Sequence, residues 1–302
     1  MNPIAVIGFI VAVVVGYFAF RGGDRGGGGG PIATGPGTGE IQNPQPVAKS
    51  RGRAPPARTT PGAPSPAGTP LAPPGQSPYA DYISIASLQR SSATPDKEYI
   101  VLQYGGSFFG SGGQKQPIDV TGWTISTVET GQVATIPRAF NIPEIDATEQ
   151  DVFLPPGGKL IVVSGTPGYQ RNFRENACVG YFNQSFSFTP SLSNSCFDPN
   201  PGKSALISLG LSGVCIDFID SIPGCRTPTI GFQQSGIGQE CVDYIREHFS
   251  YVGCVKDFRS DPKFLKNTWR VFLGLPRKFY DPRHGRVSVR DRDGLLVDEF
   301  EY

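Results

Sequence analysis

Cysteine, histidine, charge and aromatic residues are each missing from long parts of this 302-residue sequence. All six cysteines lie within residues 178–254, and the only histidines are His248 and His284. Residues 4–20 have no charge, and residues 21–78 have no aromatic side chain. A single globule would distribute these residue types more evenly, so the gaps divide the chain into segments of different character.

Several motifs of catalytic and metal sites are also missing. The chain has no Cys-x-x-Cys pair, which argues against structural zinc. No serine has glycine both two residues before and two residues after it, as the hydrolase elbow requires. Gly202-Lys203-Ser204 is similar to the end of a phosphate loop, but Phe197 stands where glycine is needed, so we expect a surface turn. The sequence therefore predicts no catalytic residue, no cofactor and no metal ligand.

Residues 4–20 form an apolar run without proline. As a helix this run is about 26 Å long, at the short end of what crosses a bilayer. No small-residue cleavage site follows it, so we expect an uncleaved, single-pass transmembrane anchor over residues 1–20. Gly8, Ala12 and Gly16 share one helix face, which permits a homodimer, although such residues are also common in membrane helices.

Residues 21–78 contain 14 glycines and 13 prolines. Such a segment buries too little apolar surface to offset its ordering entropy, which predicts a disordered linker. The linker has six basic and two acidic residues, whereas residues 79–302 have 21 basic and 24 acidic residues. The C-terminal part is therefore no basic nucleic-acid module. Contact with phosphate or anionic lipid stays open for the basic residues of the linker, Lys49, Arg51, Arg53 and Arg58.

Apolar patterns of period two begin at residue 82 and predict short strands. The predicted strands lie in residues 82–88, 98–104, 118–126, 132–136, 153–163, 286–290 and 295–300. The turn sequence Asp291-Arg292-Asp293-Gly294 between the last two is typical of a hairpin. Short strands at this spacing favour an antiparallel β-sandwich, whose core we expect Trp123 and Trp269 to fill.

Four short sequence elements follow one another in this strand-rich part. They are Glu98-Tyr99-Ile100-Val101-Leu102, Asp119-x-x-Gly122-Trp123-Thr124, Leu154-Pro155-Pro156-Gly157-Gly158 and Asp291-x-x-Gly294-x-x-Val297-Asp298. Together they resemble the lamin tail domain, specifically its bacterial, extracytoplasmic relatives, over residues 82–165 and 269–302. The resemblance implies an immunoglobulin-like fold without catalytic residues. The compact family pattern lacks residues 167–268, so a function particular to this chain is expected in that insertion.

The insertion contains every cysteine of the chain: Cys178, Cys196, Cys215, Cys225, Cys241 and Cys254. An even, confined set beyond a membrane anchor predicts three disulfides in an oxidising compartment. Two stretches that begin at Cys215 and Cys241 have apolar residues at helical spacing. They predict two amphipathic helices, which end at Pro223 and near Gly253.

Helix geometry favours one disulfide connectivity. A helix from Cys215 places Cys225 about 15 Å away, whereas bridged Cα atoms lie about 4.4 to 6.8 Å apart. If the two helices pack antiparallel, the start of each lies beside the end of the other. The favoured pairs are then Cys215 with Cys254, Cys225 with Cys241, and Cys178 with Cys196. The local alternative, Cys215 with Cys225 and Cys241 with Cys254, requires the chain to double back after each helix.

A group of carboxylates lies between predicted strands, at Glu144, Asp146, Glu149 and Asp151. No base or pocket accompanies them in the sequence. They predict a solvated loop, and weak cation binding stays an open alternative.

The orientation of the anchor depends on two opposed signals. Arg21 and Arg25 favour a cytoplasmic linker by the positive-inside rule, whereas disulfides favour an oxidising space. We give the disulfides more weight and expect an extracytoplasmic C-terminal part. The leading hypothesis is a non-enzymatic, membrane-tethered surface module that binds another macromolecule or builds the envelope. The alternatives are an enzyme or accessory that acts on cell-wall polymer through a carboxylate-lined cleft in the insertion, and a linker that contacts extracellular DNA.

Overall fold

The structure is a computed structural model that describes residues 73–91, 93–105, 116–166, 168–230 and 236–302. The predicted anchor, with Gly8, Ala12 and Gly16, and most of the predicted linker lie outside the described residues. None of the helices within the described ranges is long and apolar enough to cross a membrane.

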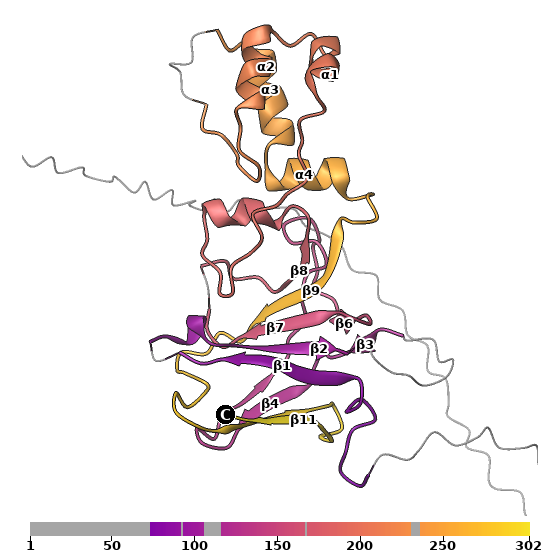
Figure 1. Cartoon of the computed structure of the whole chain (residues 1–302), viewed down its shortest axis with the longest axis vertical. Coiled ribbons are helices and arrows are strands. Elements are labelled where there is room, and N and C mark those ends of the chain that lie inside the picture. Colours follow the sequence, from indigo (N-terminus) through magenta and orange to yellow (C-terminus); the bar gives the residue numbers. More distant parts are fainter. Residues whose placement is uncertain (1–72, 92, 106–115, 167, 231–235) are drawn as a thin grey trace, which may run out of the picture. The chain divides into compact units, whose positions relative to one another are not determined.

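The first sheet has five strands in the order β1-β2-β7-β9-β8 (Figure 1). These strands are β1 (Ile83–Gln89), β2 (Tyr99–Tyr104), β7 (Lys159–Val163), β9 (Leu265–Phe272) and β8 (Phe173–Asn176). Strands β7 and β9 run parallel, with Leu160 opposite Trp269, while the other neighbours are antiparallel. The sheet is therefore mixed, and the prediction of a purely antiparallel sandwich is wrong at this pair. A parallel pair needs a long crossover, which the cysteine-bearing segment supplies.

The second sheet has four antiparallel strands in the order β11-β10-β4-β5. These are β11 (Leu296–Glu301), β10 (Arg286–Arg290), β4 (Thr124–Thr127) and β5 (Val133–Thr135). The predicted hairpin before β11 is confirmed, because Asp291 Oδ1 accepts hydrogen bonds from the backbone of Asp293 and Leu295. Gly294 follows at a φ of 77°, which glycine adopts readily. A further pair joins β3 (Ile118–Asp119) to β6 (Phe153–Leu154).

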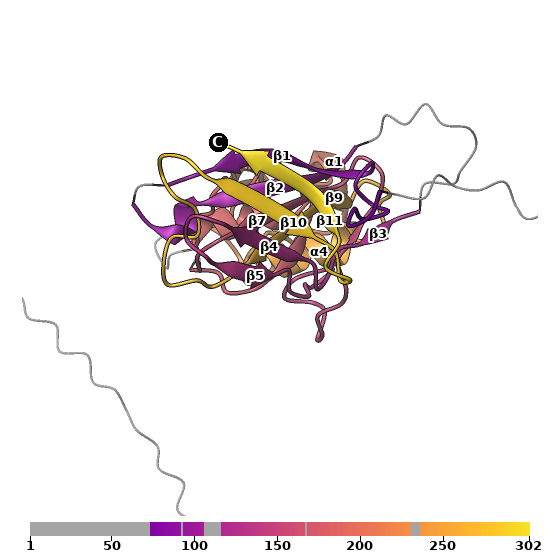
Figure 2. The same cartoon turned by 90° about the horizontal axis from the view of Figure 1, so that it is seen from below.

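The two larger sheets share one apolar core. In Figure 2 the strands β10, β11, β4 and β5 lie over β1, β2, β7 and β9. Alternate residues of β2, such as Ile100 and Leu102, are fully buried and belong to the same cluster as Val287 and Val289 of β10. The two tryptophans are 1% and 3% exposed in this cluster, as predicted for Trp123 and Trp269.

All α-helices in the described ranges lie between β8 and β9. They are α1 (Lys203–Ser208), α2 (Gly213–Asp220), α3 (Gln239–His248) and α4 (Tyr251–Phe258). Two 3-10 helices, η1 (Pro95–Lys97) and η2 (Val179–Gln184), precede them. The Gly202-Lys203-Ser204 sequence is exposed, but it begins α1 rather than forming the turn that we predicted.

The second amphipathic helix is shorter than predicted. Helix α3 ends at His248 instead of near Gly253, and α4 begins three residues later. The Ser250 hydroxyl accepts a hydrogen bond from the Gly253 backbone at 3.0 Å, so Ser250 caps a new helix. Such a cap satisfies a backbone N–H that the first turn of a helix leaves unpaired. Ser250 thus explains why the chain turns at this point.

The six cysteines form three disulfides, but with other partners than we predicted. Cys178 pairs with Cys254, Cys196 with Cys225, and Cys215 with Cys241, at Cα separations of 5.9, 5.4 and 5.7 Å. The favoured pairs, Cys215 with Cys254, Cys225 with Cys241 and Cys178 with Cys196, are therefore wrong, and so is the local alternative.

The cause of this error is the relation between the helices. Cys215 and Cys241 lie in the first turns of α2 and α3, so these two starts are side by side. An antiparallel hairpin would have placed them at opposite ends. The break after His248 puts Cys254 on α4, where it packs with Cys178 and Phe182 in a separate cluster.

Candidate functional site

The helical segment contains an open cleft of about 430 Å³, which we call the aromatic cleft. It lies where residues from the loop before α1 meet Leu209 and the helices α3 and α4. Its lining residues are Asp198, Pro199, Pro201, Leu209, Tyr244, His248, Asp257 and Phe258. This volume is within the range of sites that hold small ligands or single side chains of a partner.

Helix α3 positions two rings of the cleft. Its apolar stripe, with Cys241 and Ile245, is buried against α2. Tyr244 directly precedes Ile245 in the sequence and lies at the edge of this stripe, where it is only partly buried. Tyr244 and His248 are four residues apart and therefore neighbours on the surface of the helix, with ring centroids 4.4 Å apart. The Tyr244 hydroxyl donates to the Pro199 carbonyl at 3.3 Å. These contacts hold the Tyr244 ring in place.

The break between α3 and α4 creates the second feature of the cleft. It allows Asp257 of α4 to reach His248 of α3, with Oδ2 2.7 Å from Nδ1. Each of the two side chains is 23% exposed. The carboxylate fixes the orientation of the imidazole ring.

Two carboxylates give the cleft a negative character. Burial, followed by the charges of Asp257 and Asp198, raises the pKa of the Tyr244 hydroxyl. The neighbouring Tyr181 responds similarly: burial and the same two carboxylates raise its pKa to about 12. Its hydroxyl is buried, and within the described part of the chain it has no hydrogen-bond partner. Burial is thus the main cause of both raised pKa values, and the two carboxylates act in the same direction.

The nearby basic residue on α4 is already paired. Lys256 forms an ion pair with Glu247 of α3, which raises the pKa of the lysine and lowers that of the glutamate. No lysine or arginine is among the described residues that line the cleft. Of its two carboxylates, Asp257 contacts the His248 imidazole.

The lining residues of the cleft bear on the enzyme alternative. The cleft is concave and carries two carboxylates, which is the feature that the enzyme alternative predicts. Its described lining has no serine, threonine or cysteine to act with the His248 and Asp257 pair. Nor do three or more His, Cys, Asp or Glu side chains of the described residues come together as metal ligands.

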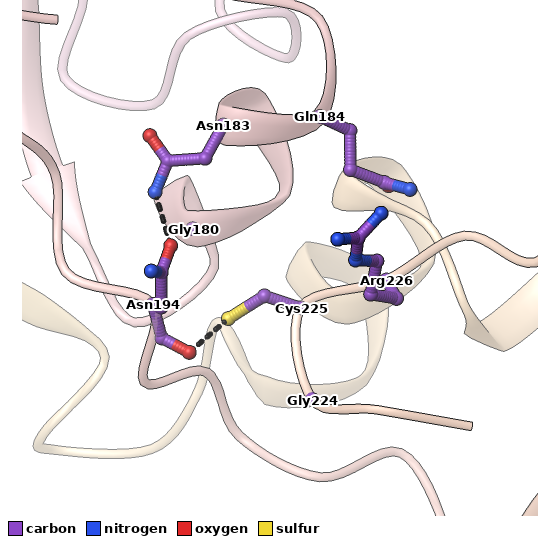
Figure 3. A pocket seen from close by; sticks show the side chains of 7 residues that line it. All are labelled: Gly180, Asn183, Gln184, Asn194, Gly224, Cys225 and Arg226. Atoms are coloured by element: carbon purple, nitrogen blue, oxygen red, sulfur yellow. Dashed lines mark hydrogen bonds between the residues drawn. The ribbon is translucent and has the colours of Figure 1, made fainter. Parts of the chain in front are cut away.

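A second, polar pocket of about 300 Å³ is lined in part by Cys225 (Figure 3), which forms a disulfide with Cys196. The side-chain amides that line this pocket form hydrogen bonds within the chain. Asn183 donates to Asn194, and Gln184 donates to the Thr227 carbonyl and accepts from the Thr227 N–H. The Cys225 sulfur lies 2.9 Å from the Asn194 carbonyl oxygen, a close contact without a proton because the sulfur is in a disulfide. These groups are used in holding the loops together, so we take the aromatic cleft as the candidate site.

The acidic loop predicted from the sequence has structural partners. Glu144 accepts from the Tyr169 hydroxyl at 3.0 Å and lies 3.6 Å from Arg171. Asp146 accepts from the Ile142 backbone, and Asp151 pairs with Arg138. The loop is thus tied to neighbouring segments, and Glu149 is exposed.

Sequence reasoning missed the residues of the aromatic cleft. Tyr244 and His248 are spaced by four residues on a predicted helix, which was the available signal. Asp257 had no such signal, because its contact with His248 depends on the unpredicted end of α3. Comparisons of this chain with protein-family models, curated proteins and solved structures found no match.

Proposed function

We propose that this protein is a non-enzymatic binding module, tethered to the membrane by residues 4–20 and displayed outside the cytoplasm. In this proposal the two-sheet core is an immunoglobulin-like sandwich of lamin-tail type, and the helical insertion carries the binding site. The aromatic cleft is the observation that carries the proposal. It combines an apolar, open cavity with two carboxylates and a fixed imidazole.

Exposed apolar side chains in the helical region that contributes Leu209 to the cleft support a macromolecular partner. Ile207, Leu209 and Val214 are 58%, 61% and 52% exposed, and all three belong to the short helical region between Lys203 and Asp220. Leu209 also lines the cleft, where an apolar group of a partner can cover it. The insertion is therefore the part of the described chain that we assign to recognition.

The three disulfides support an extracytoplasmic location. Disulfides persist in oxidising compartments and are rare in the cytosol. The structure leaves no cysteine of the chain unpaired. We expect protease added to intact cells to remove the C-terminal part, and alkaline carbonate to leave the remaining N-terminal fragment in the membrane. Protection of the C-terminal part from external protease would contradict the proposed orientation.

Site-specific photo-crosslinking in the native cell tests the binding function. A crosslinking amino acid replaces Leu209 at the cleft, and the control replaces Val133, which is 65% exposed on β5 of the second sheet. We expect a discrete adduct from position 209 that is absent from position 133. Equal adducts from both positions, or none from position 209, would reject the cleft as the binding site.

A further inference from the structure

The rings of the aromatic cleft offer faces for a flat cation. Tyr244 and His248 lie with their ring centroids 4.4 Å apart, and Phe258 of α4 lines the same cavity. A cation over an aromatic face is attracted by the negative charge of the ring system, most strongly where water is partly excluded. Pro199 and Leu209 add apolar surface that suits the aliphatic stem of a long side chain.

The carboxylates supply the opposite charge. Asp198 is exposed at the cleft, and Asp257 contacts His248 from α4. Since Lys256 pairs with Glu247, the cleft has a surplus of negative charge. An acidic ligand would be repelled by this arrangement, and a neutral apolar ligand would leave the carboxylates unused.

The same chain shows how such groups hold an arginine. The Arg171 guanidinium lies 5.0 Å from the centroid of the Phe140 ring, and its Nε is 3.6 Å from the Glu144 carboxylate. A ring face and a carboxylate together thus bind one guanidinium at the surface of this protein. A planar guanidinium stacks on rings and pairs with two carboxylate oxygens, which an ammonium group does less well.

We infer that the aromatic cleft binds an arginine side chain presented by an extended segment of a partner protein. The inference rests on the proposed binding function and names the chemistry of its ligand. The guanidinium lies against Tyr244 and pairs with Asp198, while neighbouring residues of the segment cover Leu209. Asp257 keeps its contact with His248 and contributes negative charge.

Peptide titrations of the full-length chain in mild detergent test this inference. The probes are dye-labelled pentapeptides with arginine, citrulline, lysine or glutamate at the central position, and fluorescence anisotropy measures their affinity. Citrulline has nearly the shape of arginine without its charge. We expect about tenfold weaker binding for citrulline than for arginine, an intermediate value for lysine and no binding for glutamate.

Variants locate the binding. Asp198→Asn keeps the acceptor that Asn200 uses, since Oδ1 is retained, yet removes the charge, so we expect about fivefold weaker arginine-peptide binding. Tyr244→Leu should weaken it similarly by removing the ring. Asp243→Asn, on α3 but outside the cleft, is the matched control and should leave the affinity unchanged.

The possible outcomes distinguish a failure of arginine recognition from a failure of the proposed binding function. Equal affinity for arginine and citrulline, or no effect of Asp198→Asn, overturns the inference. If no peptide binds while position 209 still gives its specific crosslink, arginine recognition is rejected and the binding function stands. Loss of both results rejects the two together.

Discussion

Two buried charged side chains, Glu98 and Arg270, hold loops against the five-stranded sheet. Glu98 is fully buried, and its Oε2 accepts from the Phe279 backbone at 2.8 Å. Arg270 is 1% exposed, and it donates to Glu175 at 2.9 Å and to the Pro190 carbonyl at 2.7 Å. Each therefore fixes a connection that the strand pattern alone leaves undetermined.

Glu98 predicts a pH dependence of stability. Burial raises the pKa of its carboxyl above the ordinary value of 4.5. Because the folded-state pKa is the higher one, the stabilising contribution is complete below pH 4.5 and is lost as the pH rises through the raised pKa. Between pH 4.5 and the raised pKa, the free energy of unfolding of the natural protein should therefore fall with increasing pH. The Glu98→Gln variant, which has no carboxyl group at this position, should not show this decrease. Urea denaturation at several pH values measures this, and Glu240→Gln, on the exposed first turn of α3, is the control.

Arg270 predicts a large loss of stability when its charge is removed. Arg270→Met leaves Glu175 buried without its partner, which costs about 3 to 5 kcal/mol of the free energy of unfolding. Arg138→Met removes an exposed ion pair with Asp151 and should cost about 1 kcal/mol or less. Similar losses for the two variants in urea denaturation would show that the buried pair is not a structural tie.

The junction of α3 and α4 depends on a glycine. A Cβ at Gly253 would lie 2.1 Å from the Glu247 carbonyl oxygen, a backbone atom that cannot move independently. Gly253→Ala should therefore separate His248 from Asp257, lower the melting temperature and weaken any ligand of the cleft. Gly213→Ala is the matched control, because its Cβ meets no atom within 4 Å at the start of α2. Calorimetry that gave the same melting temperature for both variants would contradict the need for glycine at the junction.

The strands could be predicted because each depends on its own residues. Alternation at Tyr99–Tyr104 and the Asp-Gly turn before Leu296–Glu301 are local patterns, and both elements occur as expected. The strands β8 and β9 have no clear alternation, and their partners lie far apart in the sequence. The parallel pairing of β7 with β9 depends on a crossover of about a hundred residues, which no local pattern specifies.

The candidate site was less predictable than the strands. Both amphipathic stripes are buried as the spacing indicates, with Ile219 and Ile245 in one cluster. The disulfides could not be assigned, since pairing depends on which ends of α2 and α3 meet. A short serine cap at position 250 moved Cys254 to another helix and brought Asp257 to His248. Both the connectivity and the cleft thus depend on one turn of the chain.

The disulfides are confined to one part of the described chain. The apolar cluster between the two larger sheets contains no cysteine, whereas the clusters around α2 to α4 contain Cys178, Cys215, Cys241 and Cys254. The two-sheet core therefore depends on apolar burial, while the small helical clusters depend in addition on cross-links. Small cores of this kind commonly need disulfides to stay folded.

Reduction should consequently unfold the insertion before the two-sheet core. Each disulfide contributes about 3.5 to 4.5 kcal/mol in the chain-entropy model, with the largest contribution from Cys178 and Cys254, which are 76 residues apart. After reduction, hydrogen exchange should show fast amides in α2 and α3 and persistent protection in β2 and β10. The variant Cys215→Ser with Cys241→Ser should lose protection in α2 and α3 under oxidising conditions, with β2 unchanged. Loss of protection in β2 and β10 together with the helices would contradict the separation, because it would show that the apolar core between the sheets requires the cross-linked insertion.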